Sequence, residues 1–236
     1  MKVNDQLYVL ELPLNFGGVE RKMSLSLIVD SVGGLTLVDT GLPGQIELFE
    51  QAIVAEGLSM DDLKQIVLTH QDLDHIGSLD DLRDETGATV YSHVEEVPYI
   101  NGTVPLVKTP SEERLAENPE YATVWGLLKF SQVDEAVKDG DVLSFAAGAV
   151  VISTPGHTPG HISLYLPNTK TLITGDALVS DQGILSGPAE FATPDMPLAL
   201  ESVKKFTEFD IETIVCYHGG LVTDDANGQI RRVAGI

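Results

Sequence analysis

Histidine and aspartate side chains gather at a few places in this 236-residue sequence. Five of its six histidines fall into three short groups, which lie within residues 70–75, 154–161 and 217–220. The first group has the sequence His-Gln-Asp-Leu-Asp-His. A further aspartate, Asp176, stands between the second and third groups. Imidazoles and carboxylates clustered in this way are typical ligands of divalent metal ions.

Metal binding explains how so many ionisable side chains can follow a buried strand. The first group comes directly after the apolar run 66–68, and each ionisable side chain buried there without a partner would cost free energy. Alternate residues His70, Asp72 and Asp74 can converge on one side of a turn. Imidazole and carboxylate ligands suit Zn, Mn or Fe, and no thiolate ligand is needed. The candidate ligands are too many for one tetrahedral ion and fit two ions that share a bridging carboxylate: His70, Asp72, Asp74, His75, His157, Asp176 and His218.

Some of these residues also have a simpler interpretation. Aspartate is favoured at helix N-caps, so Asp72 and Asp74 are candidates to cap a helix that begins near Ile76. The recurrence of such residues at several strand ends favours metal binding for the set as a whole. The sixth histidine, His93, stands alone before two glutamates, and we expect it to be structural.

Short strands and helices alternate along the chain and must position these side chains. Apolar runs predict strands over 7–12, 24–29, 35–38, 66–68 and 88–92, and then over 142–145, 150–153, 161–166, 171–174 and 214–217. Helical spacing of apolar residues predicts helices over 45–56, 79–85, 121–130 and 198–209. The two halves look alike, and no linker divides them. We therefore expect a single domain over residues 1–236.

The segment from about residue 95 to residue 139 breaks this rhythm. It contains four prolines and weak periodicity, which is compatible with a lid over a site or with a long connection. Its aromatic residues Tyr99, Tyr121 and Trp125 are candidates to form the wall of a substrate pocket. Ordinary core packing is the alternative for all three.

The charge balance narrows the classes of partner. The chain has 36 acidic and 14 basic side chains, a formal net charge of −22, which disfavours nucleic acid and anionic membrane surfaces as partners. We expect a small-molecule substrate, with a homodimer left open as the assembly. Cys216 is the single cysteine, which excludes an internal disulfide. The first residues lack the long apolar stretch of a signal peptide, so we expect a cytoplasmic protein.

The motifs, taken in order, resemble those of metallo-β-lactamase-fold hydrolases over nearly the whole chain. The matching segments are residues 38–41 (Val-Asp-Thr-Gly), 69–77 (Thr-His-Gln-Asp-Leu-Asp-His-Ile-Gly), 154–161, 174–176 and 218–220. Each segment alone is a weak signal, whereas five in order are specific. The resemblance implies an α/β fold, a four-layer αββα sandwich with two sheets face to face, helices outside and the metals along one edge.

The resemblance also implies a role for each site residue. Asp39 would orient a metal ligand through a hydrogen bond, and His161 would lie beside the site without binding a metal. The implied ligands are His70 and His157 for the first metal, Asp74, His75 and His218 for the second, and Asp176 as the bridge between them.

Asp72 departs from the family pattern, which is His-x-His-x-Asp-His. If Asp72 binds the first metal, two divalent ions contribute +4 and the three aspartates −3, so the site nets +1, whereas the usual set nets +2. This harder ligand set favours Mn or Fe relative to an all-histidine site, although Zn stays the first expectation. The rival interpretation is that Asp72 is displaced and one metal is weakly bound.

The expected chemistry is hydrolysis. Two neighbouring metals lower the pKa of a shared water toward ~7, and the resulting bridging hydroxide attacks an electrophilic centre. We therefore expect a binuclear metal-dependent hydrolase of a small ester, lactone or thioester, with Asp74 and Asp39 as the residues that assist catalysis. Two alternatives stay open, a di-iron redox-type centre and a non-catalytic sensor that binds a small ligand over the metals.

Overall fold

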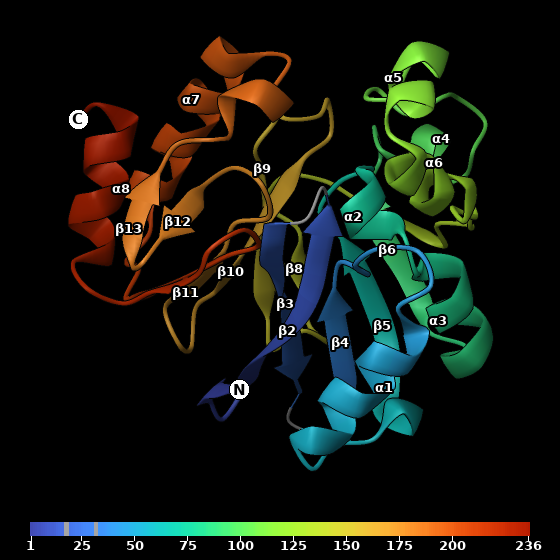
Figure 1. The fold of residues 1–236 in the computed structure, drawn as a ribbon. Coiled ribbons are helices and arrows are strands. Elements are labelled where there is room, and N and C mark those ends of the chain that lie inside the picture. The colour runs from blue at the N-terminus through green and yellow to red at the C-terminus, as the bar shows by residue number, and fades with distance from the viewer. Residues whose placement is uncertain (17–18, 31–32) are drawn as a thin grey trace.

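Two β-sheets pack face to face in the computed structural model, which describes residues 1–16, 19–30 and 33–236 (Figure 1). The first sheet has the strand order β1-β2-β3-β4-β5-β6-β7 and the second β15-β14-β11-β10-β9-β8. The strands of the first sheet are β1 (Lys2–Asn4), β2 (Leu7–Phe16), β3 (Val19–Val29), β4 (Leu35–Val38), β5 (Leu63–Leu68), β6 (Thr89–His93) and β7 (Glu135–Val137). Those of the second are β8 (Val142–Leu143), β9 (Ala149–Ser153), β10 (Ile162–Leu166), β11 (Thr171–Ile173), β14 (Thr213–Cys216) and β15 (Gly220–Val222). A separate hairpin joins β12 (Val179–Asp181) to β13 (Ile184–Ser186).

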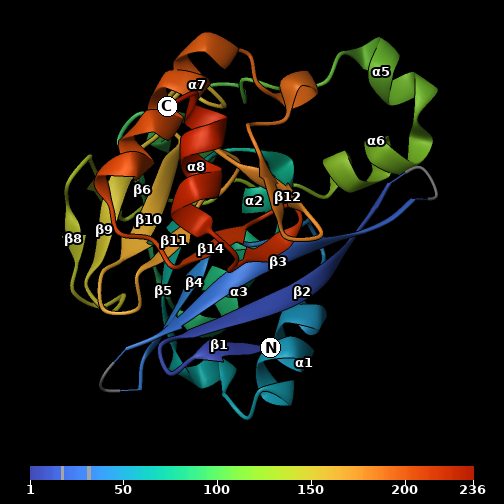
Figure 2. The same ribbon diagram turned by 90° about the vertical axis from the view of Figure 1, so that its left-hand side faces the viewer.

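Helices cover the outer face of each sheet. Figure 1 shows α1 and α3 outside the first sheet and α7 and α8 outside the second. The helices around the first sheet are α1 (Ile46–Ala55), η1 (Met60–Asp62), α2 (Leu73–Ile76), α3 (Leu79–Thr86), α4 (Val97–Ile100), α5 (Glu112–Glu117) and α6 (Pro119–Gly126). Three helices lie between β13 and β14 in the chain, and one follows β15: η2 (Glu190–Ala192), α7 (Met196–Val203), η3 (Lys204–Glu208) and α8 (Ala226–Ala234). Figure 2 shows α5 and α6 projecting beyond the sandwich, on the side of strands β2 and β3.

Three apolar layers hold the sandwich together. Successive side chains of a strand point to opposite faces of its sheet, so one strand serves two layers. In β5, Ile66 and Leu68 pack toward the outer helices, whereas Val67 packs between the sheets. The third layer lies between the second sheet and its helices, where Phe206 and Ile230 are fully buried.

The ends of strands from both sheets meet at one edge of the sandwich. β4 and β5 are parallel, so the segments that follow them, which begin at Asp39 and Thr69, leave the sheet side by side. In the second sheet, β11 and β14 are also parallel and lead to Thr174 and Tyr217. Backbone hydrogen bonds join the two sheets here, because Ser24 N donates to Tyr217 O at 2.8 Å and Ile162 N donates to Thr69 O at 3.0 Å.

The structure confirms the strands expected from the sequence and corrects several helices. The expected helix over 121–130 begins at Pro119 and ends at Gly126, because Asn118 caps it and accepts a hydrogen bond from Tyr121 N at 3.1 Å. The expected helix over 198–209 is α7 followed by the 3-10 turn η3. The C-terminal helix α8 was not predicted from the sequence.

Within the described residues, we find no helix that is long and apolar enough to cross a membrane.

The outer layer of the first sheet gives a test of the fold. Phe49 on α1 is fully buried, whereas Val54 on the same helix is 57% exposed. We expect Phe49→Ala to lower the free energy of unfolding by about 3–5 kcal/mol, because the substitution leaves a cavity in the core. Val54→Ala should change it by less than about 0.5 kcal/mol. Urea denaturation of both variants measures the difference, and equal losses would contradict this packing.

Candidate metal centre

The structure brings all seven candidate ligands together at the shared edge of the two sheets. They form two adjoining groups, and within each group the ligand atoms lie within 4.8 Å of one another. The first group is His70, Asp72, His157 and Asp176, and the second is Asp74, His75 and His218. Each sheet supplies residues to both groups.

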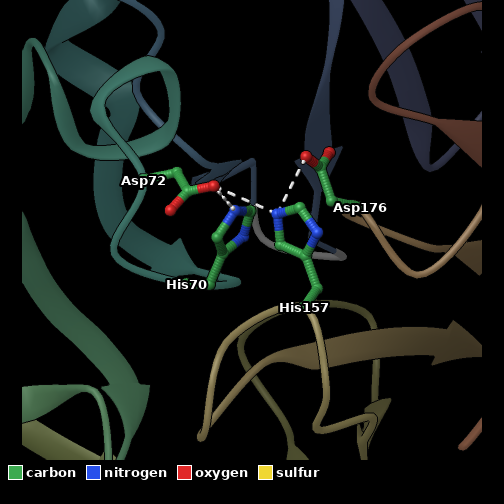
Figure 3. Close-up of side chains that lie close together, drawn as sticks. All are labelled: His70, Asp72, His157 and Asp176. Atoms are coloured by element: carbon green, nitrogen blue, oxygen red, sulfur yellow. Dashed lines mark hydrogen bonds and ion pairs between the residues drawn. The ribbon is translucent and has the colours of Figure 1, made fainter. Parts of the chain in front are cut away.

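The first group is arranged around the Nε2 atoms of two histidines (Figure 3). His157 Nε2 lies 3.0 Å from Asp72 Oδ2 and 3.2 Å from Asp176 Oδ2. His70 Nε2 lies 3.3 Å from the same oxygen of Asp72. Asp72 therefore points into the group, as expected if it replaces the usual second histidine.

Asp176 connects the two groups. Its Oδ2 atom faces His157 of the first group, while its Oδ1 atom lies 3.4 Å from His75 Nε2 and 3.5 Å from His218 Nε2 of the second. Asp74 completes the second group, with its Oδ2 atom 3.3 Å from His218 Nε2. One carboxylate thus presents one oxygen to each group, which is the arrangement expected of a bridging ligand.

The histidine rings are fixed by contacts at their Nδ1 atoms. His75 Nδ1 lies 2.9 Å from Asp39 Oδ2, and Asp39 also accepts a hydrogen bond from Thr69 N at 2.7 Å. His70 Nδ1 lies 2.9 Å from Thr69 Oγ1, and His157 Nδ1 lies 3.2 Å from Thr193 Oγ1. Each ring therefore directs Nε2 into the cluster, and Asp39 makes the orienting hydrogen bond expected of it.

Several buried polar atoms in the cluster have no hydrogen-bond partner among the described residues. They include His70 Nε2, His75 Nε2 and Asp176 Oδ1, all aimed at the interior of the two groups. A buried polar atom without a partner is costly, and one cation in each group would satisfy these atoms. The donor set of imidazoles and carboxylates thus fits divalent metal ions. The assignment of each residue to a metal stays a prediction.

The pKa values of the residues in the cluster shift in different directions. Burial, together with the neighbouring His75, lowers the pKa of His70 to about 4. Burial also lowers the pKa of His218, but the carboxylates of Asp176 and Asp74 outweigh it and raise that pKa to about 10. Burial raises the pKa of Asp176, but the surrounding histidines hold it well below its ordinary value. The carboxylates therefore stay ionised and attract positive charge, whether protons or metal ions.

The side chains of Asp72 and Asp74 do not cap a helix, which was the simpler interpretation of these residues. Asp72 occupies the N-cap position of α2, yet its carboxylate makes no capping hydrogen bond. Asp74 lies in the first turn of α2, and its carboxylate faces His218. The short helix α2 thus serves to present both aspartates to the cluster.

His161 and His93 lie outside the cluster, as expected, and so does Cys216. His161 receives a hydrogen bond from Asp176 N at its Nε2 atom, at 3.0 Å, so it lies beside the site. His93 contacts Ser153 Oγ at 3.1 Å, away from both groups. Cys216 is fully buried in β14, and burial raises the pKa of its thiol to about 12.

Glu96 is a buried residue whose role was not predicted from the sequence. Its carboxylate accepts hydrogen bonds from Gln71 N and Gln71 Nε2, both at 2.9 Å, and from Gly160 N at 2.7 Å. Gln71 belongs to the first ligand segment and Gly160 to the second, so Glu96 ties two ligand segments together. Nothing in the sequence around Glu96 indicates this role, because its partners are 25 and 64 residues away.

A cavity of about 790 Å³ opens beside the cluster and is partly formed by the segment 95–139. Tyr121 and Trp125 line it, as expected, and they also pack against the core of the first sheet. Tyr99 does not line the cavity, since its side chain packs against that core instead. The segment ends in β7, which pairs with β6. A lid motion of α5 and α6 stays a prediction.

The role of Glu96 gives a test that needs no substrate. Glu96→Ala removes the acceptor of three buried donors, so we expect a lower melting temperature and a metal affinity at least about tenfold weaker. Glu95→Ala, at the exposed neighbouring position, should leave both unchanged. Calorimetry with Zn measures both quantities, and wild-type affinity in the Glu96 variant would show that Glu96 does not organise the ligand segments.

Comparisons with known proteins agree with this geometry. The sequence profile of the metallo-beta-lactamase superfamily matches residues 19–218. The probable metallo-hydrolase YflN of Bacillus subtilis (strain 168) is 30% identical over 199 residues, which cover 78% of this chain and 74% of that protein. The hydroxyacylglutathione hydrolase of Brucella ovis is 37% identical over a shorter stretch of 91 residues, 38% of this chain and 32% of that enzyme.

The fold is also that of solved structures. A metallo-beta-lactamase family protein from Thermus thermophilus superposes with a TM-score of 0.77 at 23% identity, over 99% of this chain and 80% of that one. This likeness confirms the sandwich expected from the sequence. Together with the match over residues 19–218, it leads to one conclusion: the chain belongs to the metallo-beta-lactamase superfamily, a family of metallo-hydrolases.

Proposed function

We propose that the protein is a binuclear metal-dependent hydrolase that cleaves a small ester, lactone or thioester. The observation that carries the proposal is the position of Asp176, whose two oxygens face two separate groups of ligand atoms. Such a centre suits hydrolysis by activated water, and the sequence contains no Gly-x-Ser-x-Gly segment that would supply a serine nucleophile instead.

Each residue of the site has a proposed role. His70, Asp72 and His157 would hold one cation, Asp74, His75 and His218 the other, and Asp176 would contact both. When bound, two divalent cations supply Lewis acidity toward a carbonyl oxygen and a water molecule. Asp74 has a side chain that is 22% exposed at the cavity, so its carboxylate can accept a hydrogen bond from the attacking water and orient it.

Asp39 acts through His75 and does not reach the cavity. It is 1% exposed and holds the His75 ring by the hydrogen bond to Nδ1. A negative charge behind the imidazole raises its basicity and fixes the tautomer that leaves Nε2 free to bind a metal. Asp39 is thus a positioning residue for the second group.

The cavity and the relatives support a small acyl substrate. A volume of about 790 Å³ lies within the usual range for a small-molecule site. The hydroxyacylglutathione hydrolase of Brucella ovis acts, by its name, on an acyl thioester, which supports a thioester as one of the three substrate classes. The redox di-iron centre and the non-catalytic sensor remain alternatives that the same measurements distinguish.

Removing one ligand tests the centre and the activity together. We expect wild-type protein to bind two metal ions per chain and to hydrolyse members of a panel of esters, lactones and thioesters. His157→Ala should lose at least one ion and lower kcat/KM by at least about 100-fold, because a lost ligand costs more than a lost partner of a ligand. Metal analysis and initial rates measure both.

The matched control is His93→Ala, which removes a histidine outside both groups. It should keep the metal content and the rate. Full activity of metal-stripped protein would contradict the proposal. Two bound metals without turnover on the whole panel would favour the sensor, and iron with a redox-dependent absorbance would favour the redox centre.

The aspartate at position 72 should affect the choice of metal. Asp72→His replaces a hard oxygen ligand by an imidazole, so we expect the metal preference to shift further toward Zn. Competition between Zn and Mn, followed by metal analysis, measures the shift. Asp61→His, at an exposed position, is the control. An unchanged preference in the Asp72 variant would show that Asp72 is not a ligand.

A further inference from the structure

Basic side chains concentrate around the cavity in a protein that has few of them. The chain has 14 lysines and arginines against 36 acidic residues. Four of those 14 line the cavity: Arg21, Lys22, Lys108 and Arg114. The carboxylates of the lining belong mostly to the candidate metal ligands, whose charge bound cations would neutralise. The four basic side chains balance the four aspartates of the lining, so that two bound divalent cations would make this cavity a cationic region of an acidic protein.

Lys108 reaches the floor of the cavity. Its Nζ atom lies 2.5 Å from Asp72 Oδ2 and 2.7 Å from His157 Nε2. A protonated amine has no lone pair and cannot bind a metal itself. His157 Nε2 has a single lone pair, which either accepts a hydrogen bond from Lys108 or binds a metal. Lys108 is thus a flexible cation beside the reacting centre, able to turn toward a bound substrate.

Two arginines face the cavity without a carboxylate of their own. Arg21 on β3 and Arg114 on α5 are exposed, and within the described residues no carboxylate lies within the 4.0 Å of an ion pair. Arg83, by contrast, pairs with Asp134 at 2.6 Å. The Arg114 guanidinium lies over the Tyr121 ring, 5.3 Å from its centroid, which restricts its position at the cavity wall.

Like Lys108, which pairs with Asp72, Lys22 is already paired with a carboxylate. Its Nζ atom lies 2.6 Å from Glu11 Oε2. The charges available to a ligand without breaking an ion pair are therefore those of Arg21 and Arg114. An arginine presents a planar fork of donors that matches carboxylate and phosphate oxygens, which makes the two arginines suited to bind an anionic group.

Much of the remaining lining is apolar, although Ser180 and Asp181 also belong to it. Leu42, Leu106 and Trp125 line the same cavity as the cations. A ligand that fits both features has an apolar part and an anionic part. A neutral ester or lactone would leave the arginines without a partner, whereas an acyl compound with a remote negative charge would use both.

We propose that this cavity selects acyl substrates that carry a carboxylate or phosphate group, held by Arg114 and Arg21, with Lys108 near the acyl group to be cleaved. The proposal rests on the hydrolase function proposed above and names its substrate class. Neither arginine is a candidate metal ligand, so the anionic group would be held by residues outside the two ligand groups.

Matched substrates test the selectivity. We compare 4-nitrophenyl butyrate with the mono-4-nitrophenyl ester of glutarate and with a phosphonate-bearing analogue of the same length. We expect kcat/KM for at least one anionic ester to exceed that of the neutral ester by about tenfold or more. In Arg114→Gln this ratio should fall about tenfold, mainly through KM. Arg231→Gln, an exposed arginine on α8 that does not line the cavity, should keep the ratio.

Fluorescence provides a second measurement that needs no turnover. Trp125 is the single tryptophan of the chain and lines the cavity, so its emission reports on ligands that enter. We titrate metal-loaded protein with glutarate, inorganic phosphate and the neutral glutaramide. We expect saturable binding of glutarate or phosphate, weakened about tenfold in Arg114→Gln and in Arg21→Gln and unchanged in Arg231→Gln.

The two measurements separate the failure of this proposal from the failure of the hydrolase function. Anion binding that depends on the arginines, without turnover of any ester, would support the anionic site and contradict the hydrolase. Turnover of neutral and anionic esters at equal rates would support the hydrolase and overturn the anionic selection. Anion binding that is unaffected by both arginine substitutions would also overturn it, since the anions would then bind elsewhere. The anion that binds more tightly, glutarate or phosphate, identifies the group on the substrate that the cavity selects, a carboxylate or a phosphate.

Discussion

Seven ionisable side chains meet at one edge of the sandwich, and the cost of removing them from water governs the structure around them. His70 and His75 are fully buried, and Asp176 is 7% exposed. Three carboxylates so close together would repel one another and would favour water over the protein interior. Positive charge offsets that cost, and the orphaned atoms of the cluster all point to where it would lie.

No single segment could hold such a cluster, so segments from both sheets contribute its residues. Each ligand segment leaves the end of a strand that is itself fixed in an apolar layer, so the backbone positions are set by packing before any metal binds. Buried carboxylates then fix the side chains and segments. Asp39 holds the ring of His75 within the first sheet. Glu96 holds Gln71 and Gly160, and so joins a segment of the first sheet to one of the second.

The strands and the cluster could be predicted from the sequence because both leave local patterns. The continuous apolar run Ile66, Val67 and Leu68 indicates a strand that is buried on both faces. The spacing of the histidines can be seen in the sequence without any knowledge of the fold. Long-range contacts leave no such pattern. Thr193 and Glu96 act on residues 36 and 25 positions away, respectively, so their roles appear only once the chain is folded. The helix α8 was missed because its apolar residues are few, with Ile230 at its buried centre.

Lys108 shows how the charge of the cluster and that of the cavity are related. Its amine contacts Asp72, the residue that replaces the usual histidine and adds one negative charge to the site. If Asp72 binds a metal, a lysine at this place would offset that extra charge, and the site together with the lysine would carry the same net charge as the usual ligand set. The ion pair therefore places a positive charge at the floor of the cavity beside the candidate ligands, in a protein whose formal net charge is −22.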